Sequence, residues 1–287
     1  MKVGLLGTGL LGLPIAERML EAGHDLTVYN RTIEKALPLK KKGATVTPSA
    51  AEVISSSACV ILMLSDGKAI EEVVFNSANP SLAGKTFIQM GTIASLESIR
   101  LQKKIFELGG EYLECPVLGS RKEAVDAQLI LMVGASADRF QKWNDFLTMF
   151  GSQIYHIGDV GKASALKLAL NHLIAAHAVA FSLSLSLVQH HEIDVGQFMG
   201  ILRGSALYAP MFDKKLPKWL NREYVDANFP VKHMLKDVNL IIDEAKNNNL
   251  QVEAVEAIKR LLDKAMSAGL GEMDYSAVFN IIDKAEP

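Results

Sequence analysis

The stretch that decides the fold is Val3-Gly4-Leu5-Leu6-Gly7-Thr8-Gly9-Leu10-Leu11-Gly12. Its apolar start predicts a strand, residues 10–22 favour a helix, and residues 26–30 favour a second strand. The glycine pattern G-x-G-x-x-G therefore stands where a dinucleotide-binding turn requires it. Phosphates would rest on the free N–H groups of the helix N-terminus. We expect the cofactor to contact Gly7, Thr8, Gly9, Leu10, Leu11 and Gly12. The alternative is a glycine-rich turn in another kind of βαβ unit.

The end of the second strand indicates which dinucleotide binds. An acidic residue there would accept hydrogen bonds from a ribose 2′-OH and repel a 2′-phosphate. This chain has Asn30-Arg31-Thr32 instead. Arg31 can stack on adenine and pair with a phosphate, while Asn30 and Thr32 can donate hydrogen bonds. We therefore predict NADP(H) over NAD(H). The alternative is that Arg31 is a solvated turn residue.

Composition narrows the class of protein. The chain has 287 residues, a hydrophobic content of 49% and a formal charge of −2, which predicts a large core and no nucleic-acid partner. Its only two cysteines, Cys59 and Cys115, do not make a disulfide framework.

Residues 1–3 lead straight into a strand, so we expect no leader peptide and a cytoplasmic location. Residues 168–189 lack charges but contain Asn, His, Ser and Gln, which favours a core helix over a membrane span.

Alternating strand and helix patterns predict the architecture. Further strand-like runs lie at residues 60–64, 86–90, 112–115, 129–133 and 153–157. Beyond residue 162 only helical patterns follow: a long apolar helix to about 190, then stretches near 194–203, 231–247, 251–268 and 274–285. We therefore expect an α/β Rossmann domain with a doubly wound, mostly parallel sheet over residues 1–161. An all-α C-terminal domain would occupy residues 162–287, joined to the first by the long helix at 162–190.

Lys167 and Asn171 are the candidate catalytic residues. They are four residues apart at the start of the long helix, so they share one helix face. A partly desolvated lysine at the expected domain interface would have a lowered pKa, which suits it to donate or accept a proton. The alternative is a lysine whose charged end reaches solvent from a helix end. The histidines lack the spacing of metal ligands, so no metal site is expected.

These motifs together resemble the β-hydroxyacid dehydrogenases, and specifically their glyoxylate/succinic semialdehyde reductase branch. The resemblance covers nearly the whole chain. It rests on the opening glycine motif, on Met63-Leu64-Ser65-Asp66, and on the substrate motif at Pro116-Val117-Leu118-Gly119-Ser120. It rests further on Gly161, Lys167 and Asn171 in the pattern G-x(5)-K-x(3)-N, and on Phe229-Pro230-Val231-Lys232-His233 with Lys236-Asp237.

The resemblance implies a role for each matched residue. Lys167 would donate a proton to a carbonyl oxygen as NADPH delivers hydride, with Asn171 assisting. Leu118, Gly119 and Ser120 would hold a substrate carboxylate. The other implied substrate residues are Thr92, Phe229 and Asp237. The other implied cofactor residues are Met63, Leu64, Ser65, Thr92 and Lys236.

Two departures from the family pattern leave the substrate open. Gly91 and Leu118 both stand where the family usually has Ser. Leu118 cannot donate a side-chain hydrogen bond to a carboxylate. Either Ser120 or Arg121 replaces that hydroxyl, or the substrate is a more apolar aldehyde or ketone.

The sequence thus predicts an NADPH-dependent reductase of a small aldehyde or keto acid of the glyoxylate or succinic semialdehyde type. The alternatives are a ketone or imine reductase on the same scaffold and a non-catalytic NADP-binding protein. The long apolar helix must be covered from several sides, so we also expect a homo-oligomer, a dimer or tetramer.

Overall fold

The computed structural model describes residues 1–75 and 81–284. The chain forms two compact units, Met1–Leu168 and Ala169–Pro287. The boundary between them falls inside the long helix α8 (Lys162–His190), whereas the predicted domain boundary precedes that helix. Each unit is described by itself below.

The first unit is built on a nine-stranded, mostly parallel sheet in the order β3-β2-β1-β4-β5-β6-β8-β7, with β9 paired to β8. Strands β1 to β6 pair in parallel, whereas β8 runs antiparallel to β6 and β7. The strands are β1 (Lys2–Leu6), β2 (Asp25–Tyr29), β3 (Thr45–Val46), β4 (Cys59–Leu62), β5 (Thr86–Gln89), β6 (Glu111–Glu114), β7 (Val117–Leu118), β8 (Ile130–Gly134) and β9 (Gln153–Gly158). The predicted fold class is thereby confirmed for this unit.

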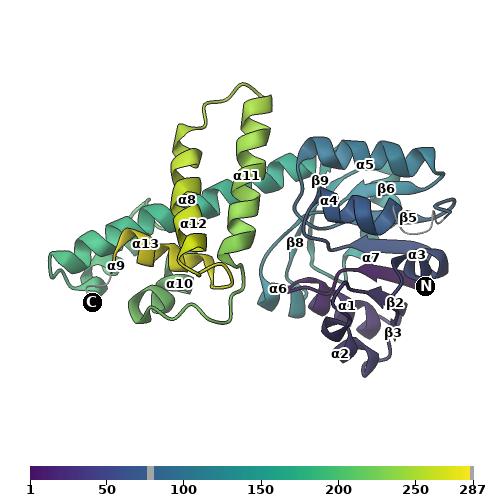
Figure 1. Ribbon diagram of the computed structural model, residues 1–287, viewed down its shortest axis with the longest axis horizontal. Helices are drawn as coiled ribbons and strands as arrows, with labels where there is room; N and C mark the ends of the chain where they lie inside the picture. Colours follow the sequence, from purple (N-terminus) through teal and green to yellow (C-terminus); the bar gives the residue numbers. More distant parts are fainter. Residues whose placement is uncertain (76–80, 285–287) are drawn as a thin grey trace. The chain divides into compact units, whose positions relative to one another are not determined.

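Helices cover both faces of this sheet, which explains why its central strands are continuous apolar runs. Side chains of α1, α2, α6 and α7 share one buried cluster, and side chains of α3, α4 and α5 share another. Figure 1 shows α1 and α2 on one side of the strands and α4 and α5 on the other. The helices are α1 (Gly12–Glu21), α2 (Leu37–Lys40), α3 (Ala50–Ser56), α4 (Gly67–Ile70), α5 (Ser95–Glu107), α6 (Arg121–Val125) and α7 (Ala137–Leu147). Short 3-10 and π-helical turns lie at Ile33–Lys35 and Glu71–Phe75.

The described part of the second unit contains helices and no β-strand, as the sequence predicts. After α8 come α9 (Val195–Arg203), α10 (Pro210–Asn221), α11 (Val231–Asn247), α12 (Glu253–Ser267), a 3-10 turn at Tyr275–Val278 and α13 (Phe279–Ile282). Helices α11 and α12 lie side by side (Figure 1). The stretch predicted as one helix at 274–285 is two short elements, and residues 285–287 lie outside the described residues.

Helix α10 was not predicted from the sequence. Pro217 stands inside it, and an internal proline normally argues against a helix because it removes one backbone hydrogen bond. Tertiary contacts compensate for this cost. Trp219 is fully buried and its Nε1 donates to Ser276 O across 3.1 Å. Lys215 Nζ lies 2.6 Å from Asp274 Oδ2, and both side chains are buried.

Helix α8 is apolar over most of its length but is not covered on all sides within one chain. By length and composition alone it could cross a membrane. Three of its leucines are half exposed: Leu173 at 51%, Leu183 at 53% and Leu187 at 55%. Their spacing places them along one side of the helix. The single chain thus leaves an apolar stripe on α8, defined by these three leucines.

Candidate active site

The glycine turn between β1 and α1 has the shape of a phosphate cradle. Gly7 has φ +103°, and a Cβ there would lie 2.4 Å from Met63 O. A Cβ at Gly12 would lie 2.1 Å from Gly7 O, so only glycine lets the helix begin this close to the turn. A Cβ at Gly9 would meet nothing within 4 Å, which leaves open space above the turn. These three positions match the roles that the sequence pattern assigns to them.

The donors at this turn fit a dinucleotide pyrophosphate. Leu11 at the N-cap of α1 makes no side-chain capping bond, and the first turn of α1 contains no acidic residue. The helix therefore presents its positive dipole end to an anion, although Leu13 N donates to Gly9 O at 3.1 Å and Pro14 has no N–H. Thr8 Oγ1 is also buried and has no hydrogen-bond partner among the described residues. A phosphate oxygen would satisfy this hydroxyl.

Asn30 ties the glycine turn to the end of β2. Its Oδ1 accepts from Thr8 N at 2.9 Å, and its Nδ2 donates to Thr32 O at 2.8 Å. The carboxamide thus holds the loop together, and it was predicted instead to donate to the cofactor. Arg31 and Thr32 are exposed beside it.

The segments after β4 and β5 also approach this turn. Met63 O is the atom that excludes a side chain at Gly7, and Ser65 Oγ donates to Asp66 Oδ2 at 2.8 Å. The departure at Gly91 has a packing reason, because a Cβ there would lie 2.7 Å from Leu64 O. Thr92 follows directly and is half-buried.

The predicted carboxylate loop is partly occupied by the chain itself. Leu118 belongs to β7 and pairs with Ile130 of β8. Ser120 is the N-cap of α6, and both its N–H, at 2.7 Å, and its hydroxyl donate to Glu123 Oε2. This is a capping box, in which the helix start satisfies its own donors. Ser120 therefore cannot bind a substrate carboxylate unless Glu123 releases it.

Asn171 and Asp237 form the polar centre of the second unit. Asn171 Nδ2 in α8 donates to Asp237 Oδ2 in α11 across 2.7 Å. Asn171 is 4% exposed and Asp237 is 3% exposed. Asp237 Oδ1 lies 2.8 Å from Lys236 Nζ. Asn171 Oδ1 is buried without a hydrogen-bond partner among the described residues, so it can accept from a ligand. Lys167, 8% exposed, precedes Asn171 by one turn of α8.

Phe229 is held by the segment that carries Asp274. Tyr275 N donates to Phe229 O at 2.9 Å, and the two rings lie 5.9 Å apart edge to face. Lys215 holds this segment through its ion pair with Asp274, and its ammonium group lies over the Tyr275 ring. Burial lowers the pKa of Lys215, and the Asp274 carboxylate opposes that shift. The buried Lys215–Asp274 ion pair thus fixes the backbone next to Phe229.

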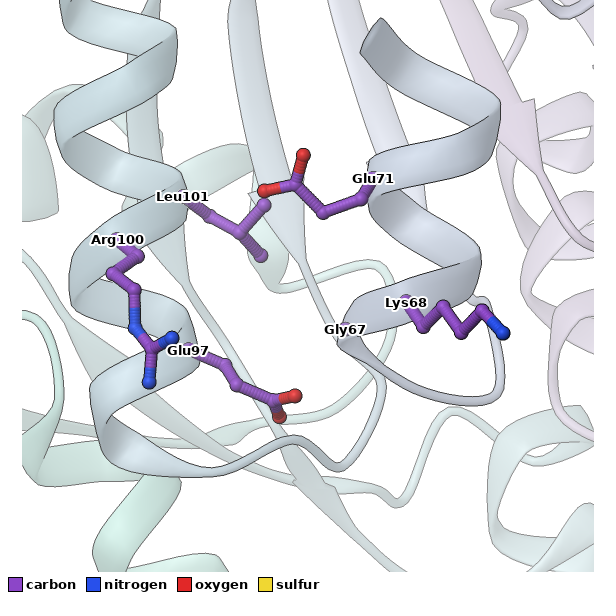
Figure 2. Close-up of a pocket in the computed structure, with 6 residues that line it drawn as sticks. All are labelled: Gly67, Lys68, Glu71, Glu97, Arg100 and Leu101. Carbon is purple, nitrogen blue, oxygen red and sulfur yellow. The ribbon is translucent and has the colours of Figure 1, made fainter. Parts of the chain in front are cut away.

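A pocket between α4 and α5 is lined by other residues. It is lined by Gly67, Lys68, Glu71, Glu97, Arg100 and Leu101 (Figure 2). None of these residues is a predicted site residue. Several of its charges are already used, since Glu71 pairs with Lys104 and Glu97 accepts from Ala94 N at 2.9 Å. The pocket is therefore no part of the candidate active site.

Comparison with known proteins identifies the family. Residues 2–158 match the NAD binding domain of 6-phosphogluconate dehydrogenase, and residues 161–282 match the family described as NAD-binding of NADP-dependent 3-hydroxyisobutyrate dehydrogenase. The chain is 33% identical over 285 residues to glyoxylate/succinic semialdehyde reductase 1 of Arabidopsis thaliana, with 98% of each chain covered. The chain belongs to the β-hydroxyacid dehydrogenase family. It lies in the glyoxylate/succinic semialdehyde reductase branch, which confirms the resemblance seen in the sequence.

Membership of this family makes the chain an oxidoreductase acting on CH–OH groups, with a nicotinamide cofactor. The fold is also that of 3-hydroxyisobutyrate dehydrogenase of Mycobacterium tuberculosis, with a TM-score of 0.88, 21% identity and 99% of each chain covered. The chain is 25% identical to the cytokine-like nuclear factor N-PAC of Drosophila melanogaster; that match covers 96% of this chain but 46% of the longer protein.

Sequence reasoning about this β-hydroxyacid dehydrogenase missed Glu114. The residue ends β6, is fully buried, and accepts hydrogen bonds from the first turn of α8. A signal was present, because Glu114 is the one charged residue in the run at 112–115 that was predicted as a buried strand. A buried charge of this kind needs partners, and the partners could not be identified from the sequence.

Proposed function

We propose that the protein is an NADPH-dependent reductase of small aldehydes or keto acids in which Lys167 is the proton donor. The observation that carries the proposal is the buried Asn171–Asp237 pair, which leaves Asn171 Oδ1 as an unused acceptor one helical turn from Lys167. A buried amide oxygen without a partner is costly, so it is expected where a ligand completes the bonding.

The chain's residues divide the work. When bound, a reduced nicotinamide supplies the hydride that the carbonyl carbon accepts. Lys167 Nζ gives a proton to the carbonyl oxygen, so the product is an alcohol and the lysine is left neutral until it regains a proton from solvent. Asn171 Oδ1 accepts from the lysine or from the new hydroxyl and so holds the reacting oxygen in place. Thr92, Phe229 and Asp237 complete the substrate site in this proposal.

The choice of NADPH rests on the end of β2. The exposed Arg31 guanidinium has no acidic neighbour at the position where a carboxylate would repel a 2′-phosphate. Thr32 is the second donor proposed there. The further cofactor contacts proposed are Met63, Leu64, Ser65 and Lys236. Lys236 would give up its ion pair with Asp237 for one with the cofactor when the cofactor binds.

The remaining proposals concern the whole protein. The apolar stripe on α8 favours a homo-oligomer over a membrane span, since Asn171 and Ser182 are buried in the same helix. Cys59 and Cys115 are both buried and free, which suits a reducing compartment such as the cytoplasm. A non-catalytic NADP-binding protein is the alternative that a turnover assay tests.

Turnover decides between these readings. The purified protein is given NADPH with glyoxylate, succinic semialdehyde, neutral aldehydes, ketones and an imine, and NADPH oxidation is followed. Lys167→Ala should lower turnover by about 10²-fold or more while NADPH affinity is unchanged, because only the acid–base group is lost. Lys162→Ala is the matched control, because Lys162 is an exposed lysine at the start of the same helix. Absence of NADPH oxidation with every substrate would favour the non-catalytic role, and full activity of Lys167→Ala would remove the proton-donor assignment.

A further inference from the structure

Glu114 joins the sheet to the first turn of the helix that carries Lys167. Its Oε1 accepts from Gly161 N at 2.7 Å, Ala163 N at 2.8 Å and Ser164 N at 3.2 Å. Its Oε2 accepts from Ser164 Oγ at 2.6 Å and from Ser98 Oγ of α5 at 2.5 Å. The side chain is 0% exposed, so five donors replace its hydration.

These contacts make Glu114 the N-terminal cap of α8, supplied from a strand distant in sequence. A carboxylate at this end of a helix satisfies free N–H groups and interacts favourably with the helix dipole. The surroundings are shaped for it. A Cβ at Gly134 would lie 2.3 Å from Glu114 Oε1, and Gly161 reaches the carboxylate with φ +102°, where a side chain would be strained.

Ser98 extends the bonding to a third element. Ser98 Oγ donates to Glu114, so the Tyr112 hydroxyl at 2.8 Å from Ser98 Oγ acts as donor in turn. Tyr112 is fully buried, and burial raises its pKa well above the usual value. It therefore stays protonated and able to donate. Strand β6, helix α5 and the start of α8 are thus joined through one carboxylate.

We propose that Glu114 is a positioning residue for the reaction, which fixes Lys167 relative to the substrate segment. Lys167 follows Ser164 by three residues in the same rigid helix, and the segment Cys115–Ser120 follows Glu114 directly in the chain. The Glu114 side chain therefore fixes the position of the proposed proton donor relative to the proposed substrate loop. The inference rests on the proposed role of Lys167. Small displacements of a reacting group have large effects on rate, about 10²-fold for 1 Å.

The test uses Glu114→Ala, which removes all five bonds, and Glu114→Gln, which keeps acceptors but loses the charge. Leu113→Ala is the matched control, because it removes a buried side chain of the same strand whose buried cluster includes residues of α1 and α7 and none of α8. The full-length protein is used throughout. We measure the rate of NADPH oxidation in a single turnover, the Kd for NADPH, and unfolding in urea. We expect Glu114→Ala to slow the single turnover by about 10- to 100-fold. The single-turnover rate of Glu114→Gln should lie between those of Glu114→Ala and the wild type. The Kd for NADPH should stay within about twofold of the wild-type value in both variants.

A double mutant separates positioning from general loss of structure. If Glu114 acts through Lys167, adding Glu114→Ala to Lys167→Ala should change the residual rate by less than about threefold, because the group being positioned is already absent. An equal fractional loss in both backgrounds would overturn the inference, as would a wild-type rate in folded Glu114→Ala. If Glu114→Ala does not fold, Ser164→Ala in the same two backgrounds carries the comparison. A fully active Lys167→Ala would instead show that the proposed function has failed.

Discussion

Asn171 Nδ2 donates to Asp237 Oδ2 across 2.7 Å, and this bond fixes which way the buried carboxamide faces. A carboxylate accepts but does not donate, so the amide nitrogen must lie toward Asp237 and the amide oxygen must lie away from it. Asp237 therefore has a role beyond the substrate contact proposed for it. It presents Asn171 Oδ1 as an acceptor, and its other oxygen is paired with Lys236.

Replacing Asp237 by Asn should leave the orientation of the Asn171 carboxamide unfixed. An amide at 237 can donate as well as accept, so Asn171 could turn its oxygen toward it. We expect kcat to fall about tenfold, the loss of one hydrogen bond to a charged group, with the protein still folded. Steady-state kinetics and circular dichroism measure the two effects. Glu272→Gln, which removes the exposed partner of Lys232 in the same unit, should leave kcat unchanged. An unchanged kcat in Asp237→Asn would contradict the orienting role.

Arg31→Ala should change the choice of cofactor. Removing the guanidinium takes away a charge-assisted contact to a 2′-phosphate, which is worth about 1.5–3 kcal/mol. We expect the Kd for NADPH to rise about 10- to 100-fold and the Kd for NADH, which loses only the contact with adenine, to rise much less, as measured by nucleotide fluorescence. Lys35→Ala is the control, because Lys35 is an exposed cation close by in sequence. Equal weakening of both nucleotides would mean that Arg31 does not read the 2′-phosphate.

The substrate loop should respond to two changes. Leu118→Ser restores the hydroxyl that the family usually has, and Glu123→Ala frees the two donors of Ser120. Each should raise kcat/KM for glyoxylate by about tenfold or more, the value of one hydrogen bond to a charged group. A neutral aldehyde of similar size should be unaffected. Asp126→Ala removes another acidic residue next to α6, one that pairs with Lys122 and not with Ser120, so it serves as the control. Kinetics equal to wild type in both variants would dismiss the loop as the carboxylate site.

The apolar stripe on α8 should hold protomers together. Leu183→Glu and Leu187→Glu place a charge on half-exposed leucines without burying it in the single chain. We expect the wild-type protein to be a dimer or tetramer and the variants to be smaller, as measured by light scattering after gel filtration. Leu250→Glu changes an equally exposed leucine away from α8 and should have no effect. A monomeric wild type would refute the oligomer.

Local patterns carried the sequence predictions that the structure supports best. The glycine turn and the alternation of strands and helices in the first unit are short-range features, and they predicted the fold class. Lys167 and Asn171 could be placed on one helix for the same reason. Contacts distant in sequence were beyond reach: Glu114 with Ser164, Lys215 with Asp274, and the packing of Trp219 that sustains α10 despite Pro217. The bond between Ser120 and Glu123 is local, and its S-x-x-E spacing is that of a capping box, but the resemblance assigns Ser120 to the substrate and gives no place to Glu123.

The Lys215–Asp274 pair and Arg31 should respond differently to ionic strength. Dissolved ions screen exposed charges over distances of about 10 Å at 0.1 M, but they scarcely reach a pair from which water is excluded. Added electrolyte therefore leaves the ion pair that holds the backbone beside Phe229 intact, whereas it would weaken the proposed attraction of Arg31 for a phosphate. Raising the ionic strength would thus reduce the affinity for the coenzyme without displacing Phe229.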